Sequence, residues 1–86
     1  MRPLYFNTED KTVVVNVKPY DMLFSAVYLK YSSDILGKIS KDNYHRTWTV
    51  FLNNEHCTNS LYHVAGFKTK RLAVEFILKM NGIRIL

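Results

Sequence analysis

The stretch YDMLFSAVYLKYSSDILGKI, residues 20–39, decides the fold class, because it lies between segments that have β-strand patterns. Apolar side chains recur within it at the spacing of one helix face: Met22, Leu23, Ala26, Val27 and Tyr31. Asp21 stands where a carboxylate stabilises a helix start, and Pro19 suits a first helical turn. The stretch therefore predicts helix, either as one element or as two short ones separated at Ser32–Asp34.

A β-hairpin is predicted ahead of this stretch. The segments RPLYFN (2–7) and KTVVVNV (11–17) are separated by turn-forming residues. Val13, Val15 and Val17 recur at every second position, which is the period of a strand with one buried face.

Two further strands are predicted after it, RTWTVFLN (46–53) and LYHVAGF (61–67). In the first of these, Trp48, Val50 and Leu52 alternate with Thr47, Thr49 and Phe51. Trp48 is expected in the core, together with Phe67 and Phe76.

A helix is predicted to follow Thr69, which is a good N-cap residue. An apolar stripe runs along it: Leu72, Ala73, Phe76, Ile77 and Met80. Gly82 is typical of a helix end, and Ile83–Leu86 suits either a last edge strand or an apolar tail that docks on a partner.

The element order is thus β-β-α-β-β-α, with an optional final strand. This order predicts an α+β protein with an antiparallel sheet and two helices packed on one face. The 86 residues correspond to one domain, residues 1–86. A chain this short has a small core, and we expect a homodimer that covers leftover apolar surface.

The composition favours a folded protein of a reducing compartment. Apolar residues make up 48% of the chain, which argues against disorder. The lone Cys57 allows no disulfide within the chain, so we expect a cytoplasmic protein. The N-terminus MRPLYFNTED lacks the apolar core of a signal peptide, and the run MLFSAVYL is too short to span a bilayer. No membrane partner is expected.

Positive charge gathers in the second half of the chain. The formal net charge is +5; residues 1–43 hold six Lys/Arg and five Asp/Glu, and residues 44–86 hold six and two. Lys68, Lys70 and Arg71 cluster where the helix dipole disfavours cations. Free backbone N–H groups and cations together bind anions, and phosphate is the commonest anion that would stabilise the cluster. The alternative is a merely solvated helix start.

The sequence TKRLA, residues 69–73, resembles the S-K-K-x-A opening of the last helix in double-stranded-RNA-binding domains. In that family this helix start reaches phosphates across the RNA major groove. The resemblance implies that Lys70 and Arg71, together with Lys68, contact phosphates.

Other residues are candidates for the same interface. Further cations that could hold phosphates are Arg46, Lys38 and Lys41. Phe51 and Tyr62 are expected to share the outer sheet face, opposite the helices, where they would stack on bases or contact a protein partner.

No catalytic or cofactor site is expected. His45, His56, Cys57 and His63 lack the paired spacing of zinc ligands. The seven Asp and Glu residues form no pair typical of acid–base or two-metal catalysis, and no glycine-rich phosphate loop is present. We therefore expect a protein that is not an enzyme and has no metal and no cofactor.

In its size, basic charge and Lys/Asn/Tyr/Ile-rich composition, the chain is similar to small accessory early proteins of large tailed phages. That similarity implies action by binding in the host cytoplasm, as an antitoxin or counter-defence protein.

Two functional hypotheses follow. The first is an RNA-binding accessory protein that inhibits, or bridges RNA to, a target such as a defence toxin or nuclease. The second is a protein–protein inhibitor or adaptor that docks through a sheet face, or through edge strands near Val13–Val17 and Ile83–Leu86, without nucleic acid.

Overall fold

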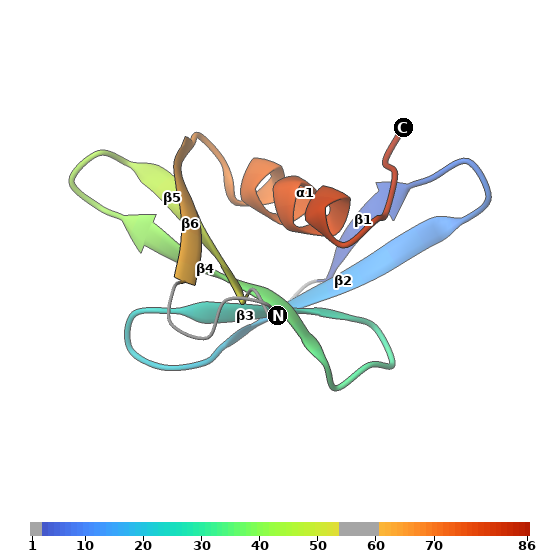
Figure 1. The fold of residues 1–86 in the computed structure, drawn as a ribbon, viewed down its shortest axis with the longest axis horizontal. Coiled ribbons are helices and arrows are strands. Elements are labelled where there is room, and N and C mark those ends of the chain that lie inside the picture. The colour runs from blue at the N-terminus through green and yellow to red at the C-terminus, as the bar shows by residue number, and fades with distance from the viewer. Residues whose placement is uncertain (1–2, 54–60) are drawn as a thin grey trace.

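A curled antiparallel sheet with one helix on its inner side makes up the described part of the chain (Figure 1). The computed structural model describes residues 3–53 and 61–86, including their side chains apart from those of 53 and 61–63. The elements are β1 (Leu4–Asn7), β2 (Thr12–Pro19), β3 (Ser25–Leu29), β4 (Ile35–Asp42), β5 (Thr47–Asn53), β6 (Leu61–Phe67) and α1 (Lys70–Met80). Each strand pairs with the next one in the chain, so the sheet order is β1-β2-β3-β4-β5-β6.

The predicted α+β fold with two helices is wrong, because residues 20–39 form a turn and two strands. Asp21 was expected to stabilise a helix start. Instead, its Oδ1 accepts hydrogen bonds from the backbone N–H groups of Leu23 and Phe24, each at 2.8 Å. This side-chain-closed turn links β2 to β3 and offers the backbone an alternative to a helix.

The apparent helical spacing in this stretch comes from a strand that is covered on both sides. Ala26 and Val27 are neighbours on β3, so they face opposite sides of the sheet, yet both are fully buried. A short apolar run of this kind has no alternation, and periodicity alone does not distinguish it from a buried helix.

The remaining elements confirm the sequence patterns. The β1–β2 hairpin, the strands β5 and β6 and the helix α1 all form where they were expected. Thr69 is the N-cap of α1, and its Oγ1 accepts a hydrogen bond from the backbone N–H of Leu72 at 3.1 Å. Residues 83–86 do not form a last edge strand, and Ile83 and Ile85 pack against the protein's own core.

The core lies between α1 and the inner side of the sheet. Its fully buried large side chains include Phe6, Ile39, Ile77, Leu78, Val15, Val27, Val50 and Val74. The helix approaches β4 most closely at Gly37, where an added Cβ would lie 3.2 Å from side-chain atoms of Ile77. Glycine at this position therefore sets the distance between α1 and the sheet. Trp48, Phe67 and Phe76 pack against this core while partly buried.

The outer edge of β1 is covered. The carbonyl oxygen of Tyr5 accepts a hydrogen bond from Arg71 Nη2 at 2.7 Å, and that of Asn7 accepts one from the N–H of Leu86 at 2.9 Å. Carbonyls two residues apart on a strand point the same way, so both bonds protect one edge.

Val13–Val17 lies in β2, between β1 and β3, and the expectation that it forms an edge strand is wrong.

Candidate nucleic-acid interface

Three exposed cations from separate segments meet at one end of the sheet. Strand register places Lys41 of β4 opposite Trp48 of β5, and Trp48 opposite Phe67 of β6. Arg46 immediately precedes β5 and Lys68 immediately follows β6, so antiparallel pairing brings them to the same end. Figure 1 shows the β4–β5 turn and the β6–α1 connection on the same side of the molecule. We call Lys41, Arg46 and Lys68 the basic end.

Aromatic rings accompany these cations. The Nζ of Lys41 lies 5.8 Å from the centroid of the partly buried Trp48 ring. Tyr44, in the β4–β5 turn, is 89% exposed. Proteins that bind single-stranded nucleic acids commonly combine exposed aromatic rings, on which bases stack, with cations that contact phosphates.

The start of α1 adds positive potential beside Lys68. The first turn of the helix contains no acidic residue, and Thr69 caps the N–H of Leu72. Lys70 opens the helix and is half-buried. The positive end of the helix dipole therefore reinforces the basic end.

Arg71 was expected to contact phosphate, but its guanidinium is engaged within the protein. Besides the bond to the Tyr5 carbonyl, its Cζ lies 4.3 Å from the centroid of the Phe6 ring. Its Nε is 3.8 Å from Oε1 of Glu75. Arg71 thus ties α1 to β1.

Lys38 and Phe51 lie elsewhere, on the outer face of the sheet. They are direct cross-strand partners between β4 and β5. The register pairs Phe51 with His63 and Leu52 with Tyr62. Since successive residues alternate between faces, Phe51 and Tyr62 occupy opposite faces, which separates two residues expected to lie together. The side chain of Tyr62 is not among those described.

The β4–β5 turn holds an ion pair that sequence reasoning missed. His45 Nδ1 lies 2.7 Å from Oδ2 of Asp42, and Oδ1 of Asp42 accepts hydrogen bonds from the N–H groups of Tyr44 and His45. The sequence DNYH carries a signal for it, since an aspartate at the start of a turn commonly binds the backbone two or three residues on. These hydrogen bonds occupy both carboxylate oxygens of Asp42 in the turn that leads to Arg46.

Acidification is expected to loosen this turn as Asp42 becomes protonated, which takes a lower pH than for an ordinary aspartate. The hydrogen bonds from the His45 ring and backbone, and then that from Tyr44, hold the pKa of Asp42 below its ordinary value of 3.8. Because the folded pKa is the lower one, the stabilisation is present above the unfolded pKa and is lost as the pH falls through the folded value. A carbon-13 NMR titration of the carboxyl group measures this. In His45→Ala the pKa should move back towards 3.8; an unchanged value in that variant would contradict the pairing.

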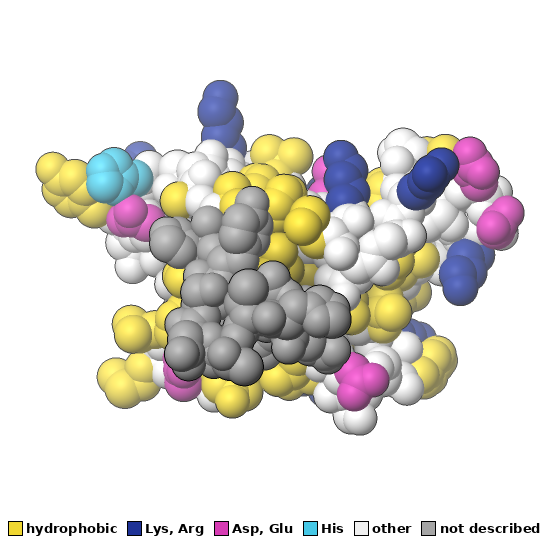
Figure 2. Space-filling view, in the orientation of Figure 1, with side chains coloured by type: hydrophobic (Ala, Val, Ile, Leu, Met, Phe, Trp, Pro, Cys, Tyr) yellow, Lys and Arg dark blue, Asp and Glu magenta, His cyan; other side chains and the backbone are white. Residues whose placement is uncertain are grey.

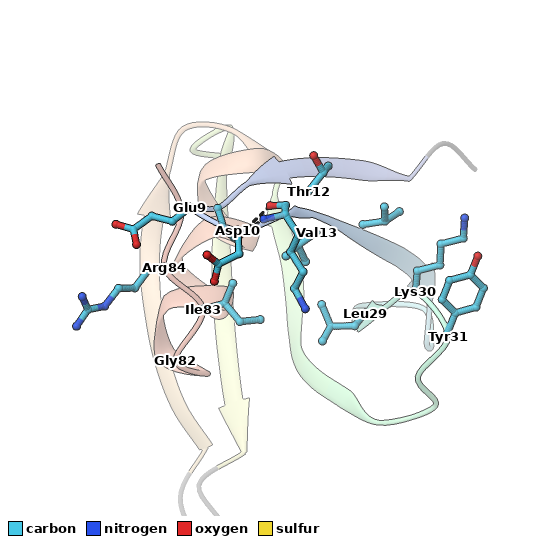
Figure 3. A pocket seen from close by; sticks show the side chains of 13 residues that line it. Glu9, Asp10, Thr12, Val13, Leu29, Lys30, Tyr31, Gly82, Ile83 and Arg84 are labelled. Carbon is cyan, nitrogen blue, oxygen red and sulfur yellow. Dashed lines mark hydrogen bonds between the residues drawn. The ribbon is translucent and has the colours of Figure 1, made fainter.

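A groove of about 640 Å³ lies beside the β1–β2 turn (Figure 3), which Figure 1 places on the opposite side of the molecule from the β4–β5 turn. The β1–β2 turn, the end of β3 and residues 82–84 line it. Its apolar side chains are Val13, Val14, Leu29 and Ile83, and its charged side chains are Glu9, Asp10, Lys11, Lys30 and Arg84. Because charges of both signs line it, this groove does not favour a polyanion.

No family model, curated protein or solved structure matches this chain. Across residues 3–53 and 61–86, no helix has the length and apolar character needed to cross a membrane. The metal candidates His56 and Cys57 lie outside the described residues.

Proposed function

We propose that this chain is a non-enzymatic RNA-binding protein of the cytoplasm, and that its basic end holds the phosphates of single-stranded RNA. The observation that supports the proposal is that strand pairing brings Lys68 to the end of the sheet where Lys41 and Arg46 flank the β4–β5 turn with the exposed ring of Tyr44. Figure 2 shows a basic side chain rising above the start of α1, and a histidine beside hydrophobic side chains at the upper left, where Figure 1 places the β4–β5 turn.

The Asp42–His45 pair supports the same reading. A carboxylate that accepts hydrogen bonds from two N–H groups and an imidazole repels a nearby phosphate less than a free one does. Tyr44 stacks edge-to-face on His45, with ring centroids 4.9 Å apart, which orients the tyrosine at the tip of the turn. In this proposal the lysines and Arg46 contact phosphates and Tyr44 stacks on a base.

The salt dependence of RNA binding tests this function. We expect fluorescence anisotropy of a labelled single-stranded RNA to show a log–log slope of about −2 to −3 against salt, since each of three or four phosphate contacts contributes roughly −0.7. Single-stranded DNA and double-stranded RNA of equal charge serve as comparisons. No binding at low salt, or a slope near zero, would contradict the proposal.

A further inference from the structure

The outer face of the sheet carries an ordered row of side chains that the RNA proposal does not use. Lys18, Ala26, Lys38 and Phe51 are successive cross-strand partners on β2, β3, β4 and β5. Ala26 is fully buried although it points away from α1. Neighbouring side chains therefore cover the outer face here.

Part of this cover comes from the β2–β3 turn, residues 20–24. The N–H groups of Tyr20 and Asp21 donate to the carbonyl of Phe24 at 2.9 and 3.2 Å. The Phe24 ring meets the Phe51 ring edge-on, with centroids 4.9 Å apart. The Nζ of Lys38 lies 3.9 Å from the centroid of the Tyr20 ring. These contacts fix the turn against the sheet.

The fixed turn presents two apolar side chains to solvent. Met22 is 101% exposed and Leu23 is 72% exposed. Figure 2 shows hydrophobic side chains protruding at the lower left, where Figure 1 places the β2–β3 turn. We define the outer patch as Lys18, Tyr20, Met22, Leu23, Phe24, Lys38 and Phe51. Apolar side chains exposed on a turn with a fixed backbone are suited to anchor a protein partner, because little backbone freedom is lost on binding.

The charge of the outer patch indicates the chemistry of that partner. Lys18 and Lys38 flank the apolar side chains, and the ring of Tyr28 lies 5.8 Å from Lys18 Nζ. Asp21 accepts two backbone hydrogen bonds through Oδ1 and shapes the turn. Lys18 and Lys38 therefore leave the outer patch with a positive charge, which favours a partner that carries carboxylates.

We propose that the outer patch docks a protein segment in which apolar side chains alternate with carboxylates. Met22 and Leu23 insert between the partner's apolar groups, and Lys18 and Lys38 pair with its carboxylates. This surface is separate from the basic end, so the inference does not rest on RNA binding.

Selection of random peptides displayed on phage against the immobilised full chain tests the inference. We expect the selected peptides to be rich in Asp and Glu beside Leu, Met or aromatic residues. Titration of one such synthetic peptide should shift the amide NMR signals of residues 18–24 and 38. Peptides without acidic enrichment, or signals that move elsewhere, would overturn the proposal.

Matched variants distinguish binding at the outer patch from nonspecific binding elsewhere on the protein. Met22→Ser and Lys38→Glu should each weaken the selected peptide about tenfold or more, because anchors dominate such interfaces. Met80→Ser and Lys79→Glu, at the other end of the fold on α1, should leave its affinity unchanged. Circular dichroism checks that all four variants fold. The proposal would be overturned if both sets of variants weakened peptide binding equally. It would also be overturned if the outer patch bound anionic lipid vesicles or RNA more tightly than it binds the selected peptide.

Discussion

Phe6→Ala is expected to reduce the free energy of unfolding by about 3–5 kcal/mol, as replacement of a buried phenylalanine by alanine typically does. Phe6 is the largest side chain with no exposed surface, and it joins β1 to the core. Its ring also lies beneath the Arg71 guanidinium, so the substitution weakens the link between α1 and the β1 edge as well. Small domains have stabilities near the low end of about 5–15 kcal/mol, and most of that margin would be lost.

Urea unfolding followed by the fluorescence of Trp48, the only tryptophan, measures this loss. Tyr5→Ala is the matched control on the same strand, because the Tyr5 side chain is 56% exposed and faces solvent. It should change stability by about 1 kcal/mol or less. Similar midpoints for the two variants would show that β1 does not pack as described.

Simultaneous reversal of charge at Lys41, Arg46 and Lys68 is expected to weaken binding of single-stranded RNA about hundredfold or more at low salt, since phosphate contacts supply most of such affinity. Each glutamate removes one attraction and adds one repulsion at the same end of the sheet. The side chains are exposed, so the fold should survive.

The control is the triple variant Lys11→Glu, Lys30→Glu and Lys79→Glu, which changes the net charge by the same amount. Lys11 and Lys30 line the groove at the other end of the sheet, and Lys79 lies in the last turn of α1. This variant should lose far less affinity. Equal losses would mean that RNA responds to overall charge and that the basic end is not a site.

How far the sequence predicts this fold depends on whether each element has one buried face. Val13, Val15 and Val17 in β2 do, and that strand forms where expected. Helix α1 also forms where expected, but it buries Val74 and Leu78 together with Ala73 and Ile77, while Leu72 and Met80 of the predicted stripe are exposed. Ala26 and Val27 are buried on opposite faces of β3, which removed the alternation and produced a false helical pattern. The second face is covered by the β2–β3 turn, a tertiary contact that no local pattern reports.

The candidate site was predictable by residue type but not by grouping. Lys41, Arg46 and Lys68 were each candidates, yet only the pairing of β4, β5 and β6 brings them together. Arg71 was a candidate because it belongs to the cation cluster at the helix start, and its bond to the Tyr5 carbonyl was not foreseen because it spans 66 positions in the chain. Lys18 was not among the candidates, because only its cross-strand pairing with Ala26, and that of Ala26 with Lys38, places it in the outer patch.

The position of α1 after all the described strands has a consequence for how the protein is made. Each strand can pair with its predecessor as soon as it leaves the ribosome, because the described sheet contains neighbour pairs alone. Its inner side, however, stays uncovered until α1 has been synthesised. During translation the nascent chain therefore displays an apolar surface that chaperones bind, and ribosomes stalled before residue 70 would hold an aggregation-prone intermediate.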